Sequence, residues 1–192
     1  MIVETERLQL REFSADDLDS IYELVYADSV VKDAWSGRQG TPEEIKRAFA
    51  EEWIAPDSEY GLKALVLKET GSLVGLMGFQ RHMSDEDMSW LALESHPGHK
   101  VGGDPAFIEA ELTYALGRSY WGNGYATEMG EKLVEFGFTS LGIHRIINGV
   151  RSNNDRSIGL MRRLGFRIEE NNASTPPGIN GILDTNIPSV YP

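Results

Sequence analysis

The spacing of hydrophobic and polar residues predicts strands and helices in succession along this chain. Apolar positions alternate with polar ones over residues 8–13, which predicts a first strand. Ser14 is placed to cap a helix whose apolar residues then recur every three or four positions. Thr41, followed by a proline and by Glu44, has the pattern of a capping box and predicts a second helix to about residue 54.

Runs rich in Leu, Val, Ile and aromatic residues predict the remaining strands, at residues 61–67, 73–79, 88–93, 106–116, 143–150, 166–169 and 182–187. Two further helices are predicted, one from the glycine-rich turn at residues 120–128 to about residue 141 and one over residues 154–164. Residues 68–72 are predicted to form a hairpin turn, and residues 96–105 and 171–181 to form loops. This order predicts an α/β (α+β) fold, a mixed sheet with helices on its faces, in one domain over residues 1–192.

The turn at residues 120–128 contains the most informative pattern of the chain. Gly122 and Gly124 tolerate positive φ angles, so several backbone N–H groups can face one anion where the helix begins. The alternative is a glycine-rich turn without a ligand. No Lys-Ser or Lys-Thr pair follows the glycines, as it would in a P-loop, and no third glycine completes a dinucleotide fingerprint.

Composition limits the chemistry that the chain can carry. The 192 residues include no cysteine, and the four scattered histidines do not suggest a metal site. A net charge of −12 disfavours binding to nucleic acid and would suit a cationic partner, although acidity also serves solubility. No apolar run approaches the roughly 18 residues of a membrane span, and the first residues lack a signal-peptide pattern. We therefore expect a cytoplasmic protein that binds no metal and contacts neither nucleic acid nor membrane.

Four landmarks follow one another along the chain. They are the opening segment at residues 4–11, the strand at 111–116, the turn at 120–128, and Asn154 with Ser157 followed by a Leu-Gly-Phe at 164–166. In this order they resemble the landmarks of GNAT N-acetyltransferases, and more narrowly those of ribosomal-protein alanine and serine N-terminal acetyltransferases, over about residues 2–170. The resemblance implies a mostly antiparallel central sheet with helices on both faces and with splayed fourth and fifth strands.

The resemblance implies that acetyl-CoA is the co-substrate. Its diphosphate would be bound by the turn, at Trp121, Gly122, Asn123, Gly124, Tyr125, Ala126 and Thr127. The wider family often has Gln or Arg where this chain has Trp121, so the indole is either part of this site or a packing residue. The backbone of Tyr114, Ala115 and Leu116 would bond the pantetheine arm, and the N–H of Leu116 or Ala115 would polarise the thioester carbonyl. Asn154 would bond the pantetheine amide, and Asn is also a favoured helix N-cap.

Acetyl transfer to an amine requires a group that takes a proton from the attacking nitrogen. Glu109 and Glu111 lie two apart on a predicted strand and so on one face; either could be this base, or both could be solvated carboxylates. The resemblance offers Ser157 as a hydrogen-bond partner for the departing CoA thiolate. Direct transfer in a ternary complex needs no metal and no cysteine, so histidines such as His144 are expected to be structural or solvated.

The acceptor is expected to be a primary amine, above all the N-terminus of a protein or peptide. The alternatives are a small cationic amine, such as an aminoglycoside or polyamine, and a CoA-binding module without turnover. In the resembling family the acceptor enters opposite CoA, which here points to Asp33, Trp35, Arg38, Trp90 and the loop at residues 96–105. That loop and the Pro-Pro-Gly at residues 176–178 depart from the group's pattern and leave the ribosomal-protein substrate open. The resemblance also implies a homodimer.

Overall fold

The computed structural model describes residues 3–34, 40–53, 59–81, 108–171 and 178–185, with the side chains of Glu52, Trp53 and Arg81 excepted. The chain divides into two compact units, Met1–Arg81 with Leu112–Leu133 and His82–Glu111 with Val134–Pro192. Hydrogen bonds order the strands as β1-β2-β3-β4-β5-β6-β8-β7, and strand β5 contributes residues to both units. The predicted class, a mixed and mostly antiparallel sheet with helices, is confirmed. The single domain over residues 1–192 stays a prediction beside this division.

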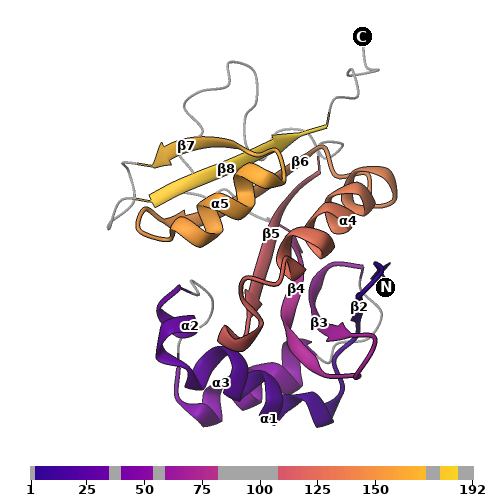
Figure 1. Cartoon of the computed structure of the whole chain (residues 1–192), viewed down its shortest axis with the longest axis vertical. Helices are drawn as coiled ribbons and strands as arrows, with labels where there is room; N and C mark the ends of the chain where they lie inside the picture. The colour runs from indigo at the N-terminus through magenta and orange to yellow at the C-terminus, as the bar shows by residue number, and fades with distance from the viewer. Residues whose placement is uncertain (1–2, 35–39, 54–58, 82–107, 172–177, 186–192) are drawn as a thin grey trace. The chain divides into compact units, whose positions relative to one another are not determined.

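The secondary structure is labelled in Figure 1. The strands are β1 Val3–Glu4, β2 Leu8–Arg11, β3 Gly61–Leu67, β4 Leu73–Arg81, β5 Glu109–Leu116, β6 Arg145–Arg151, β7 Arg167–Asn171 and β8 Gly178–Asp184. The helices are α1 Leu18–Ile21, α2 Ser29–Ala34, α3 Pro42–Ala48, α4 Tyr125–Thr139 and α5 Asp155–Arg163. The turns η1 Ala15–Asp17 and η4 Arg118–Tyr120 are 3-10 helical, whereas η2 Tyr22–Ala27 and η3 Phe49–Trp53 are π-helical and continue α1 and α3.

In the first unit, strands β1 to β4 pair antiparallel with their neighbours in sequence, and helices α1 to α3 gather beside them (Figure 1). Apolar residues of the helical segments, such as Phe49, form one buried cluster with Leu62 of β3 and Leu76 of β4. The β3–β4 hairpin turns where the sequence predicts. A register shift between Leu65 and Val66 marks a β-bulge in this pair, which bends the strands locally.

In the second unit, β5 pairs parallel with β6, β6 pairs antiparallel with β8, and β8 pairs antiparallel with β7. Helix α5 lies along β7 and β8 (Figure 1), and its Ile158 and Met161 are buried. At Gly181 of β8 an added Cβ atom would lie 2.4 Å from Met161 Sδ and 3.0 Å from the Phe166 ring. A side chain at this position would displace the side chains of Met161 and Phe166, so glycine suits this close packing.

The predicted boundaries near the C-terminal end are wrong. Residues 171–181 were expected to be a loop and the last strand was expected to begin at residue 182, but Asn171 ends β7 and β8 begins at Gly178. Gly and Asn have weak strand propensity, yet strand β6 supplies a partner for every residue of β8. Strand β1 and helix α2 have no counterpart among the predicted elements, whereas the π-helical turns η2 and η3 lie within the two helices predicted near the N-terminus. The strand predicted at residues 88–93 and the loop at 96–105 lie outside the described residues.

Candidate cofactor and catalytic site

A glycine turn in the first unit forms the start of helix α4. The turn η4 ends at Tyr120, and Gly122 and Gly124 both have a φ of +80°, which residues with a Cβ atom rarely adopt. The N–H groups of Thr127 and Glu128 donate to Gly124 O at 3.1 and 3.0 Å and make the first helical bonds. The predicted glycine-rich turn into a helix is therefore confirmed.

The preceding N–H groups of this turn are open. Those of Gly122, Asn123, Gly124, Tyr125 and Ala126 have no hydrogen-bond acceptor among the residues that the structure describes. Gly124 has no side chain that could cap the helix, and a Cβ atom at Gly122 would meet no atom within 4 Å. Unsatisfied N–H groups at the positive end of a 15-residue helix are an arrangement that binds phosphates.

Side chains fix the turn from the protein side. The Trp121 Nε1 donates to Leu116 O at 2.8 Å, and the indole packs against the hydrophobic cluster of the first unit. The Asn123 Nδ2 donates to the carbonyls of Tyr120 and Trp121 at 3.1 and 3.2 Å. These contacts favour the packing interpretation of Trp121.

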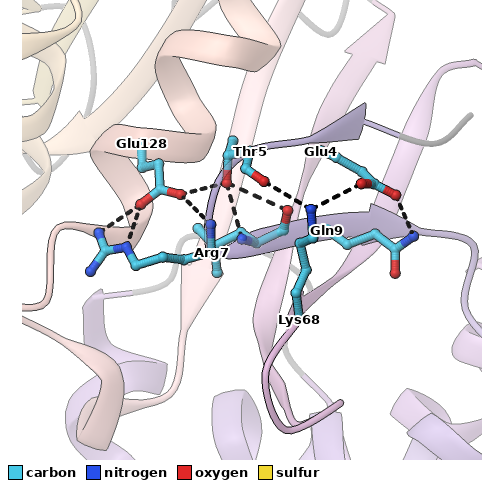
Figure 2. A network of polar contacts seen from close by, with 7 residues as sticks. Glu4, Thr5, Arg7, Gln9, Lys68 and Glu128 are labelled. Atoms are coloured by element: carbon cyan, nitrogen blue, oxygen red, sulfur yellow. Dashed lines mark hydrogen bonds and ion pairs between the residues drawn. The ribbon is translucent and has the colours of Figure 1, made fainter.

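Glu128, in the first turn of α4, is bound by the segment between β1 and β2 (Figure 2). Its Oε1 accepts from Thr5 Oγ1 at 2.5 Å and from Arg7 N at 3.0 Å, and its Oε2 accepts from Arg7 Nε at 2.7 Å. Arg7 Nη2 lies 2.6 Å from the same Oε2. Burial alone would raise the pKa of the Glu128 carboxyl, but the donors of Thr5 and Arg7 outweigh burial and hold that pKa below its ordinary value. No local sequence pattern pairs Arg7 with Glu128, which is 121 positions away.

Strand β5 ends in the first unit with Tyr114, Ala115 and Leu116, where the β4 backbone comes close. A Cβ atom at Gly75 of β4 would lie 2.2 Å from Ala115 O and 2.7 Å from Leu116 Cα. Both Ala115 and Leu116 are buried. The glycine of β4 therefore permits a tight contact that fixes the β5 backbone where the sequence predicts the pantetheine arm to bind.

Glu109 and Glu111 lie on one face of β5 in the second unit, where the pairing with β6 covers residues 109–111. The Glu109 Oε2 is 3.6 Å from Nη1 of Arg145, whose side chain is only 3% exposed and whose Nε donates to Asp184 Oδ1 at 2.6 Å. A buried guanidinium requires such carboxylate partners, which gives Glu109 a structural task. Glu111 lies half-buried on the same face, and the role of either carboxylate as the base stays a prediction.

Asn154 and Ser157 lie at the start of helix α5, also in the second unit. The Asn154 Oδ1 accepts from Ser157 N at 3.2 Å, and the Asn154 carbonyl accepts from Ile158 N at 3.0 Å. The interpretation of Asn154 as an N-cap is therefore confirmed. Contacts of Asn154 and Ser157 with a cofactor stay predictions.

Most of the residues expected to bind the acceptor, namely Trp35, Arg38, Trp90 and residues 96–105, lie outside the described residues. Asp33 is described and lies exposed on α2. His144 has the structural role expected of it, since its Nδ1 accepts from Ile108 N at 3.1 Å. Within the described ranges, no group of three or more His, Asp and Glu side chains could hold a metal ion. The described helices include none with the length and apolar composition of a membrane span.

Comparison with known proteins identifies the family to which the chain belongs. Residues 7–167 match the model of the acetyltransferase (GNAT) domain. The uncharacterized N-acetyltransferase p20 of Bacillus licheniformis is 29% identical over 167 residues, which cover 86% of this chain and 82% of the relative. The spermidine N(1)-acetyltransferase of Escherichia coli K12 is 32% identical over 97 residues, which cover 47% and 52%.

A solved structure agrees with the fold. The ribosomal-protein-S5-alanine acetyltransferase from Vibrio fischeri superposes with a TM-score of 0.66 at 16% identity and full coverage of both chains, a likeness that shows the fold. The family model spans most of the described chain and includes the glycine turn of α4. The resemblance read from the four landmarks is thus confirmed at the level of the family. The chain belongs to the GNAT acetyltransferase family and is an acetyl-CoA-dependent N-acetyltransferase.

Proposed function

We propose that this enzyme acetylates the α-amino group of a protein or peptide N-terminus by direct attack on acetyl-CoA in a ternary complex. The observation that supports the site most strongly is the open start of α4. The N–H groups from Gly122 to Ala126 have no acceptor in the described structure. A diphosphate needs several donors at once, and a helix start supplies them from the backbone. Thr127 was expected among these donors, but its N–H bonds Gly124 O at 3.1 Å.

Strand β5 and helix α5 would bind the rest of the cofactor. The backbone of Tyr114, Ala115 and Leu116 would pair with the pantetheine arm as with a strand. The N–H of Ala115 or Leu116 would donate to the thioester oxygen as negative charge develops on it. Such a donor is effective only if its position is fixed, and the close contact of β4 at residue 75 supports this. Asn154 would add a hydrogen bond to the pantetheine amide.

The transfer is a substitution at the acyl carbon. Glu111 would accept a proton from the acceptor's ammonium group, directly or through water, so that the neutral nitrogen can form the new C–N bond. The nitrogen gives up its second proton to solvent as the C–S bond breaks. Ser157 would hydrogen-bond the departing thiolate, which takes its proton from solvent. The products are the acetylated amine and CoA.

The choice of acceptor follows from proton affinity. An α-amino group has a pKa near 8, so roughly a tenth of it is already neutral at pH 7, whereas an alkyl amine near 10.4 is less than about 0.1% neutral. A single carboxylate such as Glu111 therefore suits an N-terminal amine best. A small cationic amine is the second candidate, because the relative from Escherichia coli is a spermidine acetyltransferase and this chain has a net charge of −12.

The test is acetyl-CoA turnover, read as free thiol release, against peptides with free N-termini, polyamines and aminoglycosides. We expect the highest kcat/KM for a peptide whose α-amine is free, and no product when that α-amine is blocked. Turnover of spermidine alone would replace the peptide acceptor with the polyamine. CoA binding without turnover of any amine in the panel would contradict the proposed acceptor classes.

Replacing the proposed base isolates its role. Glu111→Gln should lower kcat about 100-fold, because general-base assistance is lost, while CoA binds as before. Glu170→Gln, which changes an exposed carboxylate on β7, is the matched control and should leave both quantities unchanged. A Glu111→Gln enzyme with the kcat of the wild type would remove Glu111 from the mechanism.

A further inference from the structure

The polar contacts of Glu128 raise an electrostatic problem at the start of α4. An acidic residue in the first helical turn stabilises the helix, but it places negative charge beside the N–H groups proposed to bind a diphosphate. Left alone, this carboxylate would repel the anion that the turn is otherwise built to bind. Arg7 offsets this negative charge, because its backbone N–H and its side chain both bond to the Glu128 carboxylate (Figure 2).

The Arg7 guanidinium is placed at the glycine turn itself. Its centre lies 4.7 Å from the centroid of the Tyr125 ring, and its Nη2 would be 3.5 Å from a Cβ atom on Gly124. The side chain is 47% exposed, and Nη1 makes no hydrogen bond to any residue that the structure describes. A guanidinium carries five N–H donors in a rigid fork, so it can bind the carboxylate on one side and offer donors on the other.

The neighbouring polar contacts support this role of Arg7. Thr5 lies on the same short segment as Arg7, and its Oγ1 donates to Glu128 Oε1 at 2.5 Å. The other cation of the same network, Lys68, bonds Glu4 Oε2 at 3.0 Å and Thr5 O at 3.1 Å (Figure 2). No contact of Lys68 with the residues of the glycine turn is present in the described structure. Only one of these two cations is therefore placed to affect an anion at α4.

We propose that Arg7 is a positioning residue of the cofactor site, which neutralises Glu128, holds the first turn of α4 and presents its remaining N–H groups to the cofactor diphosphate. The proposal rests on the proposed function, because it requires that the turn binds the diphosphate of CoA. In this proposal Arg7, which lies between β1 and β2, supplies at the turn the positive charge that Trp121 cannot supply. Because the two partners of the pair have opposite effects on an anion, they can be tested separately.

Calorimetric titration of CoA at low and high ionic strength provides the test. Arg7→Gln should weaken CoA binding about tenfold at low salt, because a charge-assisted contact is lost and Glu128 is left unneutralised. The difference from the wild type should shrink at high salt, because salt screens partly exposed charges. Lys68→Gln, the matched control, removes one positive charge from the same network and should bind CoA like the wild type.

The Glu128→Gln variant tests whether Arg7 affects CoA binding through its charge or only through its support of the fold. It removes the negative charge but keeps Arg7, so CoA should bind as tightly as to the wild type or more tightly. Weaker binding in Glu128→Gln, or a loss in Arg7→Gln that is equal at both salt concentrations, would overturn the proposal and leave a purely structural clamp. If the wild type itself binds no CoA, the proposed function fails with it, whereas tight wild-type binding with an unchanged Arg7→Gln rejects the inference alone.

Discussion

Helices α3 and α4 of the first unit begin in opposite ways. At α3, Thr41 Oγ1 accepts from Glu44 N at 3.3 Å, Glu44 Oε2 accepts from Thr41 N at 2.8 Å, and Pro42 at the first position has no N–H. At α4, Gly124 precedes the first helical residue, and the N–H groups from Gly122 to Ala126 have no acceptor among the described residues. One helix closes its own start, whereas the start of the other is open.

The difference distinguishes a helix start that is capped by its own residues from one whose N–H groups are left open. Both helices place a glutamate in the first turn, so acidity alone does not distinguish them. At α3 the carboxylate of Glu44 binds its own helix, whereas at α4 the carboxylate of Glu128 is withdrawn to a distant segment. The N–H groups at the start of α4 are therefore not occupied by the Glu128 carboxylate, whose charge is paired with Arg7.

The largest expected effect comes from placing a negative charge at the open start. Gly124→Glu should weaken CoA binding at least about 100-fold, because a carboxylate would stand where the diphosphate is proposed to lie. The substitution also strains the backbone, since Gly124 has a φ of +80°. The measurement is a CoA titration of the folded variant.

Gly71→Glu is the control for that strain. Gly71 has a φ of +70° in the β3–β4 turn, and a Cβ atom there would meet nothing within 4 Å, as in an open loop. The two variants should lose similar stability, and only Gly124→Glu should lose CoA. Equal CoA affinity in both would show that the α4 turn does not bind the diphosphate.

A smaller effect should follow from opening the closed start. Thr41→Ala removes the side-chain cap of α3 and should lower the free energy of unfolding by about 1 kcal/mol. CoA affinity should not change, because no ligand is proposed at this helix. Urea denaturation and CoA titration of the same preparation check both parts, and a loss of CoA affinity would break the contrast between the two helix starts.

The smallest expected effect is a change in how the free energy of unfolding depends on pH. The hydrogen bonds of Thr5 and Arg7 hold the pKa of Glu128 below its ordinary value against the effect of burial. A carboxyl whose pKa is lowered by folding stabilises the protein above its unfolded-state pKa, and this contribution is lost as the pH falls through the lower folded-state pKa. Glu128→Gln should therefore lose less stability than the wild type as the pH is lowered from neutral to below the ordinary pKa of a glutamate, by under about 1 kcal/mol because the pair is partly exposed. Unfolding curves that depend on pH identically would contradict this.

The features that the sequence predicts correctly depend on neighbouring residues. The capping box of Thr41, the glycine turn before α4 and the N-cap Asn154 are each defined within about four positions, so their patterns are legible without the fold. The Arg7–Glu128 pair is not, because its partners are 121 positions apart and only the sheet brings them together.

Tertiary packing also explains the errors. Asn180 and Gly181 lie in a strand because β6 pairs with every residue of β8, and no local pattern reports that pairing. Glu109 looks equivalent to Glu111 in the sequence, since both alternate with buried residues. The contact of Glu109 with the buried Arg145 is not visible in the sequence, because Arg145 comes from another strand.

The most direct test of the central claim is the backbone amide NMR spectrum of the enzyme as CoA is added. The account predicts that the amide signals of residues 122–126 shift and exchange more slowly with solvent, whereas those of residues 42–45 at the start of α3 stay in place. CoA binding that leaves the signals of residues 122–126 unchanged would contradict the account, because the diphosphate would then be bound elsewhere.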